Sequence, residues 1–170
     1  MSETEAGVWI EFPTSNSVLI HGVTINYDLP PAKAVSGLPS NPHIASDYLK
    51  ELWNGGKSGI VKGVTIPLCW PRNRFDTTRG RELQREIGYG LPAELVVLFQ
   101  EGNHAGRIRH RLWDIGIRWI VALGESDRAI WRGFRPLLLD LDPENPSVRL
   151  GFTRDLWHSN YALIGAPVLP

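Results

Sequence analysis

The chain has 170 residues, with 18 Lys and Arg against 18 Asp and Glu, so its formal net charge at pH 7 is zero. A composition of 42% hydrophobic and 21% charged residues is typical of a folded protein and excludes a chain too polar to form a core. Zero net charge excludes a strong overall attraction to nucleic acid or to anionic membranes, and the single cysteine excludes an intramolecular disulfide and a cysteine-bound zinc.

The sequence shows no segment that would carry the chain into or across a membrane. No apolar run approaches the roughly 20 residues that a membrane helix needs. The first residues, MSETEAGVW, are acidic and lack the pattern of a signal peptide. We therefore expect one soluble, cytoplasmic domain over residues 1–170, without a membrane segment, a cofactor or a metal.

The first part of the chain predicts a hairpin, a loop and a helix. Apolar, β-branched runs predict strands over Val8–Phe12 and Val18–Tyr27, joined by the turn Pro13–Ser17. Four prolines within residues 28–42 predict an irregular loop. A helix is predicted over Asn41–Trp53, with Asn41 as its N-cap and glycines after its end.

The middle of the chain alternates between strand and helix patterns. Strands are predicted over Gly59–Cys69, Leu95–Phe99 and Ile117–Leu123, which are largely apolar. Helices are predicted over Arg79–Ile87 and in the stretch that begins at His104 and ends before Gly116. The second helix is the clearer, because four apolar residues fall on one narrow face (Ala105, Ile108, Leu112 and Ile115) and Gly116 ends the pattern.

The last part of the chain predicts a second hairpin. A short helix over Ser126–Phe134 precedes strands over Pro136–Leu141 and Val148–Phe152, and Tyr161–Leu169 is predicted as an edge strand. Helices alternating with strands in the middle, with hairpins at both ends, favour an α+β fold. We expect a mixed β-sheet of about six to seven strands with three to four packed helices in a single domain.

Arginines gather in two parts of the sequence. One group lies in the turn after the third strand and in the next helix, and the other lies on the polar face of the later helix beside a tryptophan. Guanidinium groups pair with carboxylates and phosphates and stack on aromatic rings, so we expect the two groups to meet on one binding surface. The acids in the same segments leave mutual neutralisation as the alternative. The predicted binding residues are Arg72, Arg74, Arg81, Arg85, Arg107, Arg111 and Trp113.

The function hypothesis is therefore a non-enzymatic protein that binds a protein partner through an arginine- and tryptophan-bearing surface. Two alternatives remain. The same arginines could bind the phosphate backbone of a nucleic acid. A small thiol enzyme is the other alternative, because His110 and Asp114 are four residues apart on a helix and could orient each other if Cys69 lay opposite as the nucleophile.

Three other features of the sequence give no clear indication of a functional site. Gly56-Lys57-Ser58 resembles the end of a phosphate-binding loop but has Glu51 where that loop needs a glycine. The acidic turn Asp140–Glu144 lacks the ligand spacing of a calcium loop. His21 and His158 are expected to be structural histidines.

Overall fold

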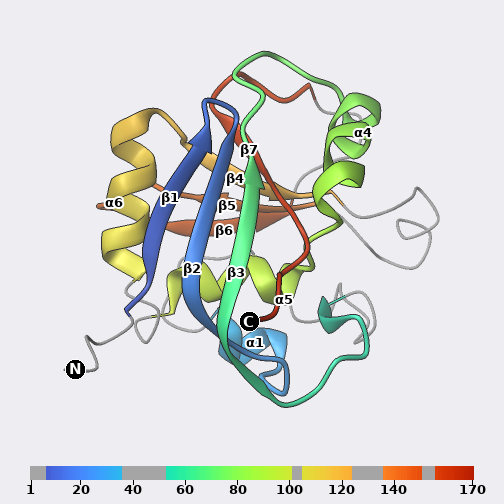
Figure 1. Ribbon diagram of the computed structural model, residues 1–170, viewed down its shortest axis with the longest axis vertical. Coiled ribbons are helices and arrows are strands. Elements are labelled where there is room, and N and C mark those ends of the chain that lie inside the picture. Colours follow the sequence, from blue (N-terminus) through green and yellow to red (C-terminus); the bar gives the residue numbers. More distant parts are fainter. Residues whose placement is uncertain (1–6, 36–52, 101–104, 124–135, 151–155) are drawn as a thin grey trace.

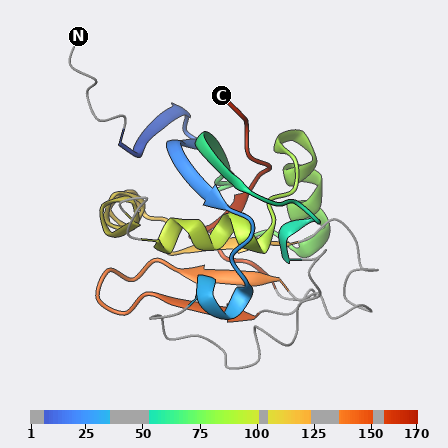
Figure 2. The ribbon, with the colours of Figure 1, turned by 90° about the horizontal axis from the view of Figure 1, so that it is seen from below.

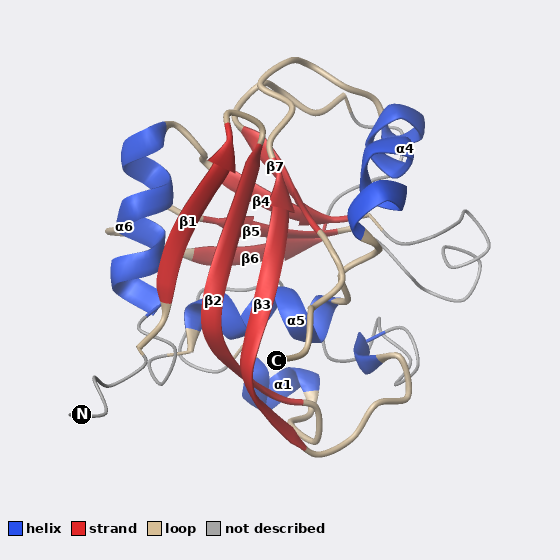
Figure 3. Ribbon diagram, viewed as in Figure 1, coloured by secondary structure: helices blue, strands red, loops and turns tan. Residues whose placement is uncertain are grey.

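The protein is an α+β fold built on one mixed sheet of seven strands, as the sequence predicts (Figure 3). The computed structural model describes residues 7–35, 53–100, 105–123, 136–150 and 156–170. Within those residues there are four α-helices, so the expected number of helices is also confirmed.

The first three strands form a continuous antiparallel ribbon. They are β1 (Trp9–Thr14), β2 (Ser17–Asn26) and β3 (Ile60–Cys69), and each pairs with the next. Both predicted N-terminal strands and the third strand are thus confirmed. β2 alternates between buried and half-buried residues, because one face of the ribbon packs on the core and the other faces outward.

The remaining strands continue the sheet from β3. They are β7 (Tyr161–Ile164), β4 (Trp119–Ala122), β5 (Leu137–Asp140) and β6 (Ser147–Leu150), in that spatial order. Among the described strands, the pairing of β4 with β7 is the only parallel one. The predicted C-terminal hairpin is present as β5 and β6, but the last strand is not an edge strand, because β7 lies between β3 and β4.

The prediction for Leu95–Phe99 is wrong. This segment lies in the helix α5 (Pro92–Val96) and the 3-10 helix η1 (Val97–Phe99). Pro92 occupies the first turn, and the Glu94 carboxylate accepts the Leu91 N–H, so a helix start is encoded just upstream of the apolar run. A short apolar run that is buried on all sides has no periodicity to separate helix from strand.

The other predicted helices agree better with the structure. α4 (Thr77–Ile87) begins at Asp76, whose side chain accepts the Arg79 N–H. α6 (Ala105–Ile115) ends before Gly116, as predicted, and this glycine has a positive φ of 110°. Ile108 and Leu112 are buried as expected, but Ile115 is 37% exposed and lies off the buried stripe.

The two faces of the sheet carry separate apolar clusters. Neighbouring residues of β4 illustrate the division, because Ile120 packs in the large cluster and Val121 in the small one. The large cluster also contains residues of α1 (Pro31–Ala34), α5 and α6, whereas the small one packs against α4 through Leu83. The sheet is bent so strongly that α5 lies between its two halves (Figure 2).

Some expectations fall partly or wholly outside the described residues. The helix predicted over Asn41–Trp53 is described only at its end, where Trp53 and Asn54 are helical. The loop predicted over residues 28–42 contains α1 in its described part, and the helix predicted over Ser126–Phe134 lies outside. No helix in the described ranges has the length and apolar character needed to span a bilayer.

Candidate functional site

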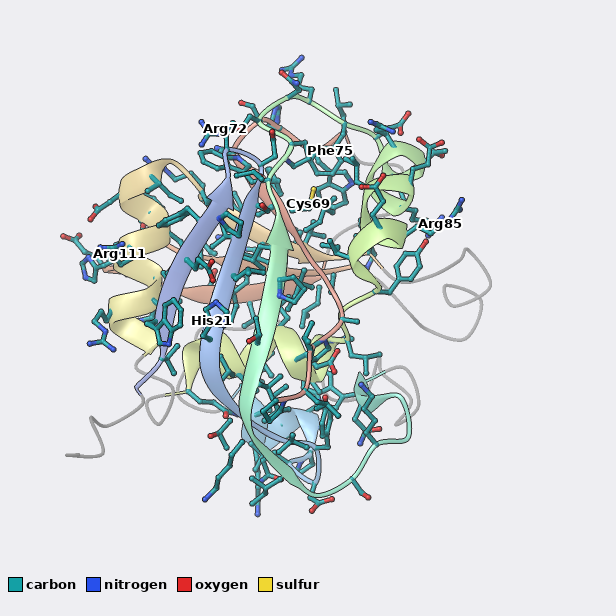
Figure 4. The ribbon with its side chains drawn as sticks, viewed as in Figure 1. His21, Cys69, Arg72, Phe75, Arg85 and Arg111 are labelled. Carbon is teal, nitrogen blue, oxygen red and sulfur yellow. The ribbon has the colours of Figure 1, made fainter. Side chains whose placement is uncertain are left out.

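The two arginine groups do not meet. Arg85 lies on α4 and Arg111 on α6, and these helices stand on opposite sides of the molecule (Figure 4). The view from below gives the same separation (Figure 2). The helices pack on different faces of the sheet, because α4 joins the small apolar cluster and α6 the large one. The expected single surface of converging arginines is therefore wrong.

Most of the first arginine group is engaged locally or stands exposed by itself. Arg72 has a positive φ of 64°, stacks 4.0 Å above the Trp70 ring and donates to the Ser15 carbonyl at 2.6 Å. Arg74 and Arg85 are exposed, and Arg81 is half-buried. These contacts tie the loop after β3 to the β1–β2 turn, so Arg72 has a structural role.

Trp113 is also used within the fold. The Arg118 guanidinium covers its ring at 3.9 Å and donates to its carbonyl oxygen at 2.5 Å. The ring is half-buried and packs against the large apolar cluster. Trp113 therefore does not belong to the exposed face that carries Arg107 and Arg111.

The structure does not assemble the thiol site. Cys69 lies at the end of β3 beside α4 (Figure 4), whereas His110 and Asp114 are exposed on α6 across the molecule. Burial, with a smaller contribution from the charge of Glu86, raises the pKa of the Cys69 thiol. A nucleophilic cysteine needs the opposite shift, toward the thiolate.

The remaining sequence motifs have structural explanations. In the acidic turn, the Asp140 and Asp142 carboxylates accept the N–H groups of Asp142 and Glu144, as in ordinary turns. The described residues contain no cluster of three or more His, Cys, Asp or Glu that would hold a metal ion. Lys57 of the glycine–lysine motif contacts the Glu94 carboxylate at 3.1 Å.

Glu94 is a buried carboxylate that sequence analysis missed. It is fully buried, and its oxygens accept from the Leu91 N–H at 2.7 Å, the Tyr27 hydroxyl at 2.6 Å and the Lys57 ammonium at 3.1 Å. Three donors satisfy a charge that would otherwise be costly to bury. This cluster fixes α5 to the end of β2 and to the loop before β3.

The outer face of β1, β2 and β3 carries a chain of hydrogen bonds centred on His21. Its Nε2 lies 2.7 Å from the Glu11 carboxylate and its Nδ1 2.9 Å from the Thr65 hydroxyl, while Trp9 stacks on the ring with a centroid distance of 4.1 Å. The order of groups is that of a catalytic triad. However, the Thr65 N–H is bonded to the Val168 carbonyl at 2.9 Å, so the N–H nearest to that hydroxyl is not free to hold an oxyanion.

A hollow between β1 and α6 is a candidate site that lies within the described residues. It has a volume of about 270 Å³, and its lining comes from the start of β1 and the first two turns of α6: Val8, Trp9, Ile10, Arg107, Ile108 and Arg111. α6 runs alongside the outer edge of β1 (Figure 1). We call it the β1–α6 groove.

The groove has an apolar floor and two cations. Ile108 is 2% exposed and Val8 3%, so their side chains form the floor, while Trp9 is 54% exposed and stands at the rim. Arg107 donates to the Val8 carbonyl at 2.8 Å, which holds its guanidinium over the groove. Arg111 lies 6.0 Å from the centre of the Phe12 ring. Among the described residues, no acidic side chain lines the groove.

Sequence reasoning thus found Arg107 and Arg111 and missed the residues beside them. The two arginines are one helical turn apart on a predicted helix, which is a local signal. The pairing of α6 with the edge of β1 joins segments about 100 residues apart and has no signal in the sequence. A tryptophan at position 9, in the first predicted strand, is the sequence feature that could have indicated the groove.

Comparisons of the chain with protein-family models, with curated proteins and with solved structures found no match.

Proposed function

We propose that this protein binds a protein partner through the β1–α6 groove, and that an acidic segment of the partner enters it. The observation that carries the proposal is the groove itself: an apolar hollow of about 270 Å³, bordered by two guanidinium groups and an exposed tryptophan, with no acid among the described residues that line it. Tryptophan and arginine are the residues that most often dominate binding energy at protein interfaces.

Charge supports an acidic partner. Within the described part of the chain, neither Arg107 nor Arg111 forms a salt bridge, whereas Arg79 on the opposite helix pairs with Glu82 at 3.0 Å. A carboxylate from outside would meet both guanidinium groups without breaking a salt bridge among the described residues. Guanidinium groups also stay charged throughout the physiological pH range, so this attraction does not depend on a titration.

The two alternative functions have less support. Binding along a nucleic acid needs cations spread over many phosphates, and the arginines on α4 and α6 lie on opposite sides of the molecule. The thiol enzyme needs Cys69 near α6, where the structure does not place it. A groove with an apolar floor favours side chains of a protein over a phosphate backbone.

Selection from a phage-displayed library of random 12-residue peptides tests the proposal with the protein as it is. We expect enriched peptides to be acidic and apolar. Their affinity should fall at least about tenfold with Arg111→Glu, because the substitution removes one charge-assisted contact and adds a repulsive one. Arg85→Glu is the matched control, since it makes the same charge change at an exposed position on α4.

The outcomes separate the functions. Peptides that bind both variants as well as the unmodified protein would overturn the proposal, as would the absence of any enrichment. Binding of a 20-residue oligothymidylate that weakens steeply with salt, and that Arg85→Glu and Arg111→Glu reduce equally, would instead support the nucleic-acid alternative.

A further inference from the structure

We propose that the partner segment binds as an added strand on the free edge of β1 and carries two acidic residues at alternate positions, Asp/Glu-x-Asp/Glu. This inference rests on the proposed function and specifies its partner. β1 stands at one end of the sheet and pairs only with β2, so its other edge is unpaired among the described strands. An unpaired edge is a ready template for another strand.

The backbone of β1 shows which groups face the groove. The Val8 carbonyl accepts from Arg107, a side chain of α6, so it points to the groove side and away from β2. Backbone groups of alternate residues in a strand point to the same edge. The N–H and carbonyl of Ile10 therefore also face the groove, whose lining includes this residue. They offer one donor and one acceptor to an incoming strand.

The chain itself limits the length of the added strand. The pairing of β1 with β2 shifts register between Glu11 and Thr14, and Pro13 has no N–H to donate. A proline and a bulge are the features that end strand pairing at an edge. The added strand is thus confined to the first half of β1, which is also the part that lines the groove.

The spacing of the two arginines matches alternate residues of an extended chain. Arg107 and Arg111 are four residues apart on α6, and a helix rises about 1.5 Å per residue, so their backbone positions are about 6 Å apart along the axis. Residues i and i+2 of a strand are about 6.6–6.8 Å apart and point to the same side. Because α6 runs alongside β1, a strand added there presents two side chains to the two guanidinium groups (Figure 1).

The acidic strand is the occupant that the charges favour over a second copy of this chain. Pairing of β1 with β1 of another copy would bring further arginines to the seam, while Glu11 of each copy is held by its own His21 at 2.7 Å. An external segment with alternate acids brings two carboxylates to two cations that form no salt bridge among the described residues. Apolar residues two positions before and two positions after this pair of acids lie on the same face of the added strand and would cover Ile108 and Ile10.

Two peptides of the same composition test the spacing by fluorescence anisotropy. The first, Thr-Val-Thr-Glu-Thr-Glu-Thr-Val-Thr, has its acids at i and i+2. The second, Thr-Val-Thr-Glu-Thr-Thr-Glu-Val-Thr, has them at i and i+3, which places them on opposite faces of a strand. We expect the first to bind at least about fivefold more tightly, because only one acid of the second reaches an arginine.

N-methylation of single amides of the first peptide tests main-chain pairing. In an added strand the N–H groups point alternately to β1 and to solvent. Because β1 offers one free acceptor there, the Ile10 carbonyl, methylation should weaken binding at least about tenfold at the single residue whose N–H meets that carbonyl and leave binding unchanged at the two neighbouring residues. The i, i+2 peptide should also lose its advantage on Arg111→Glu and keep it on Arg85→Glu.

The results that overturn strand addition differ from those that overturn the proposed function. Equal affinity of the two peptides, or the absence of any single amide whose methylation weakens binding, overturns the added strand but leaves groove binding of library peptides intact. Binding unaffected by Arg111→Glu overturns both. A dimer that dissociates on Ile10→Pro would show that β1 pairs with a second copy, and it would overturn the external partner.

Discussion

Replacement of Tyr27 by phenylalanine isolates one hydrogen bond of the buried Glu94 cluster. The Tyr27 hydroxyl donates to the Glu94 carboxylate at 2.6 Å, and the carboxylate is fully buried. A hydrogen bond to a charged group contributes about 1.5–3 kcal/mol, and the phenylalanine ring fills the same space apart from the oxygen. We therefore expect Tyr27→Phe to lower the free energy of unfolding by about 2 kcal/mol.

Thermal and guanidinium denaturation provide the measurement. For a chain of this length, each kcal/mol corresponds to a shift in Tm of about 2–4 °C, so Tm should fall by roughly 4–8 °C. Tyr89→Phe is the matched control, because Tyr89 is half-buried and donates to the neutral Arg81 carbonyl at 3.2 Å. A loss from Tyr27→Phe no larger than that from Tyr89→Phe would refute the role of the buried carboxylate.

The same variant has a distinct dependence on alkaline pH. Burial, followed by the hydrogen bond to Glu94, raises the pKa of the Tyr27 hydroxyl above its ordinary value of about 10. The folded state thus holds the proton more tightly, and this stabilisation is present below pH 10 and is lost as the pH rises further. The difference in stability between the unmodified protein and Tyr27→Phe should therefore shrink above about pH 10. A constant difference up to pH 11 would contradict the assignment.

Three further experiments test the packing. Leu112→Ala should cost about 2–5 kcal/mol in urea denaturation because the side chain is fully buried, whereas Ile115→Ala, 37% exposed, should cost less than about 1 kcal/mol; equal losses would contradict the observed orientation of α6. Gly80→Ala should destabilise α4 by about 1–3 kcal/mol, since its Cβ would lie 2.6 Å from a leucine methyl, while Gly106→Ala on α6 meets no atom within 4 Å and should stabilise by about 0.5 kcal/mol. Cys69 should react slowly with iodoacetamide at pH 7 and rapidly in denaturant, because burial raises its pKa; fast reaction of the folded protein would restore the thiol alternative.

Local sequence patterns predicted correctly the helices and strands whose ends depend on residues nearby in the chain. α6 ends where it was predicted to end, because the apolar stripe of Ile108 and Leu112 and the stop at Gly116 are local features of the sequence. The β5–β6 hairpin follows it for the same reason. The segment Leu95–Phe99 was mispredicted because its apolar residues Leu95–Leu98 are all buried, and a run of this kind has no periodicity to separate helix from strand.

The position of the last strand in the sheet and the separation of the two arginine groups depend on contacts between distant segments. Tyr161–Ile164 has the composition of a strand, but only the crossing of the chain places it between β3 and β4. Arg85 and Arg111 both lie on exposed helix faces, as their sequences indicate, yet α4 and α6 cover opposite faces of the sheet. A periodic pattern shows that a helix has an apolar face and does not show which sheet face receives it.

The sequence by itself determined the α+β class, most of the helices and strands, and the placement of Arg107 and Arg111 on one side of one helix, because these follow from residues close together in the chain. Only the tertiary structure decided that these arginines border a groove with Val8, Trp9 and Ile10, and that Glu94 is buried among three donors. Both arrangements join residues separated by tens of positions or more. They depend on how the sheet bends around α5, which no local pattern specifies.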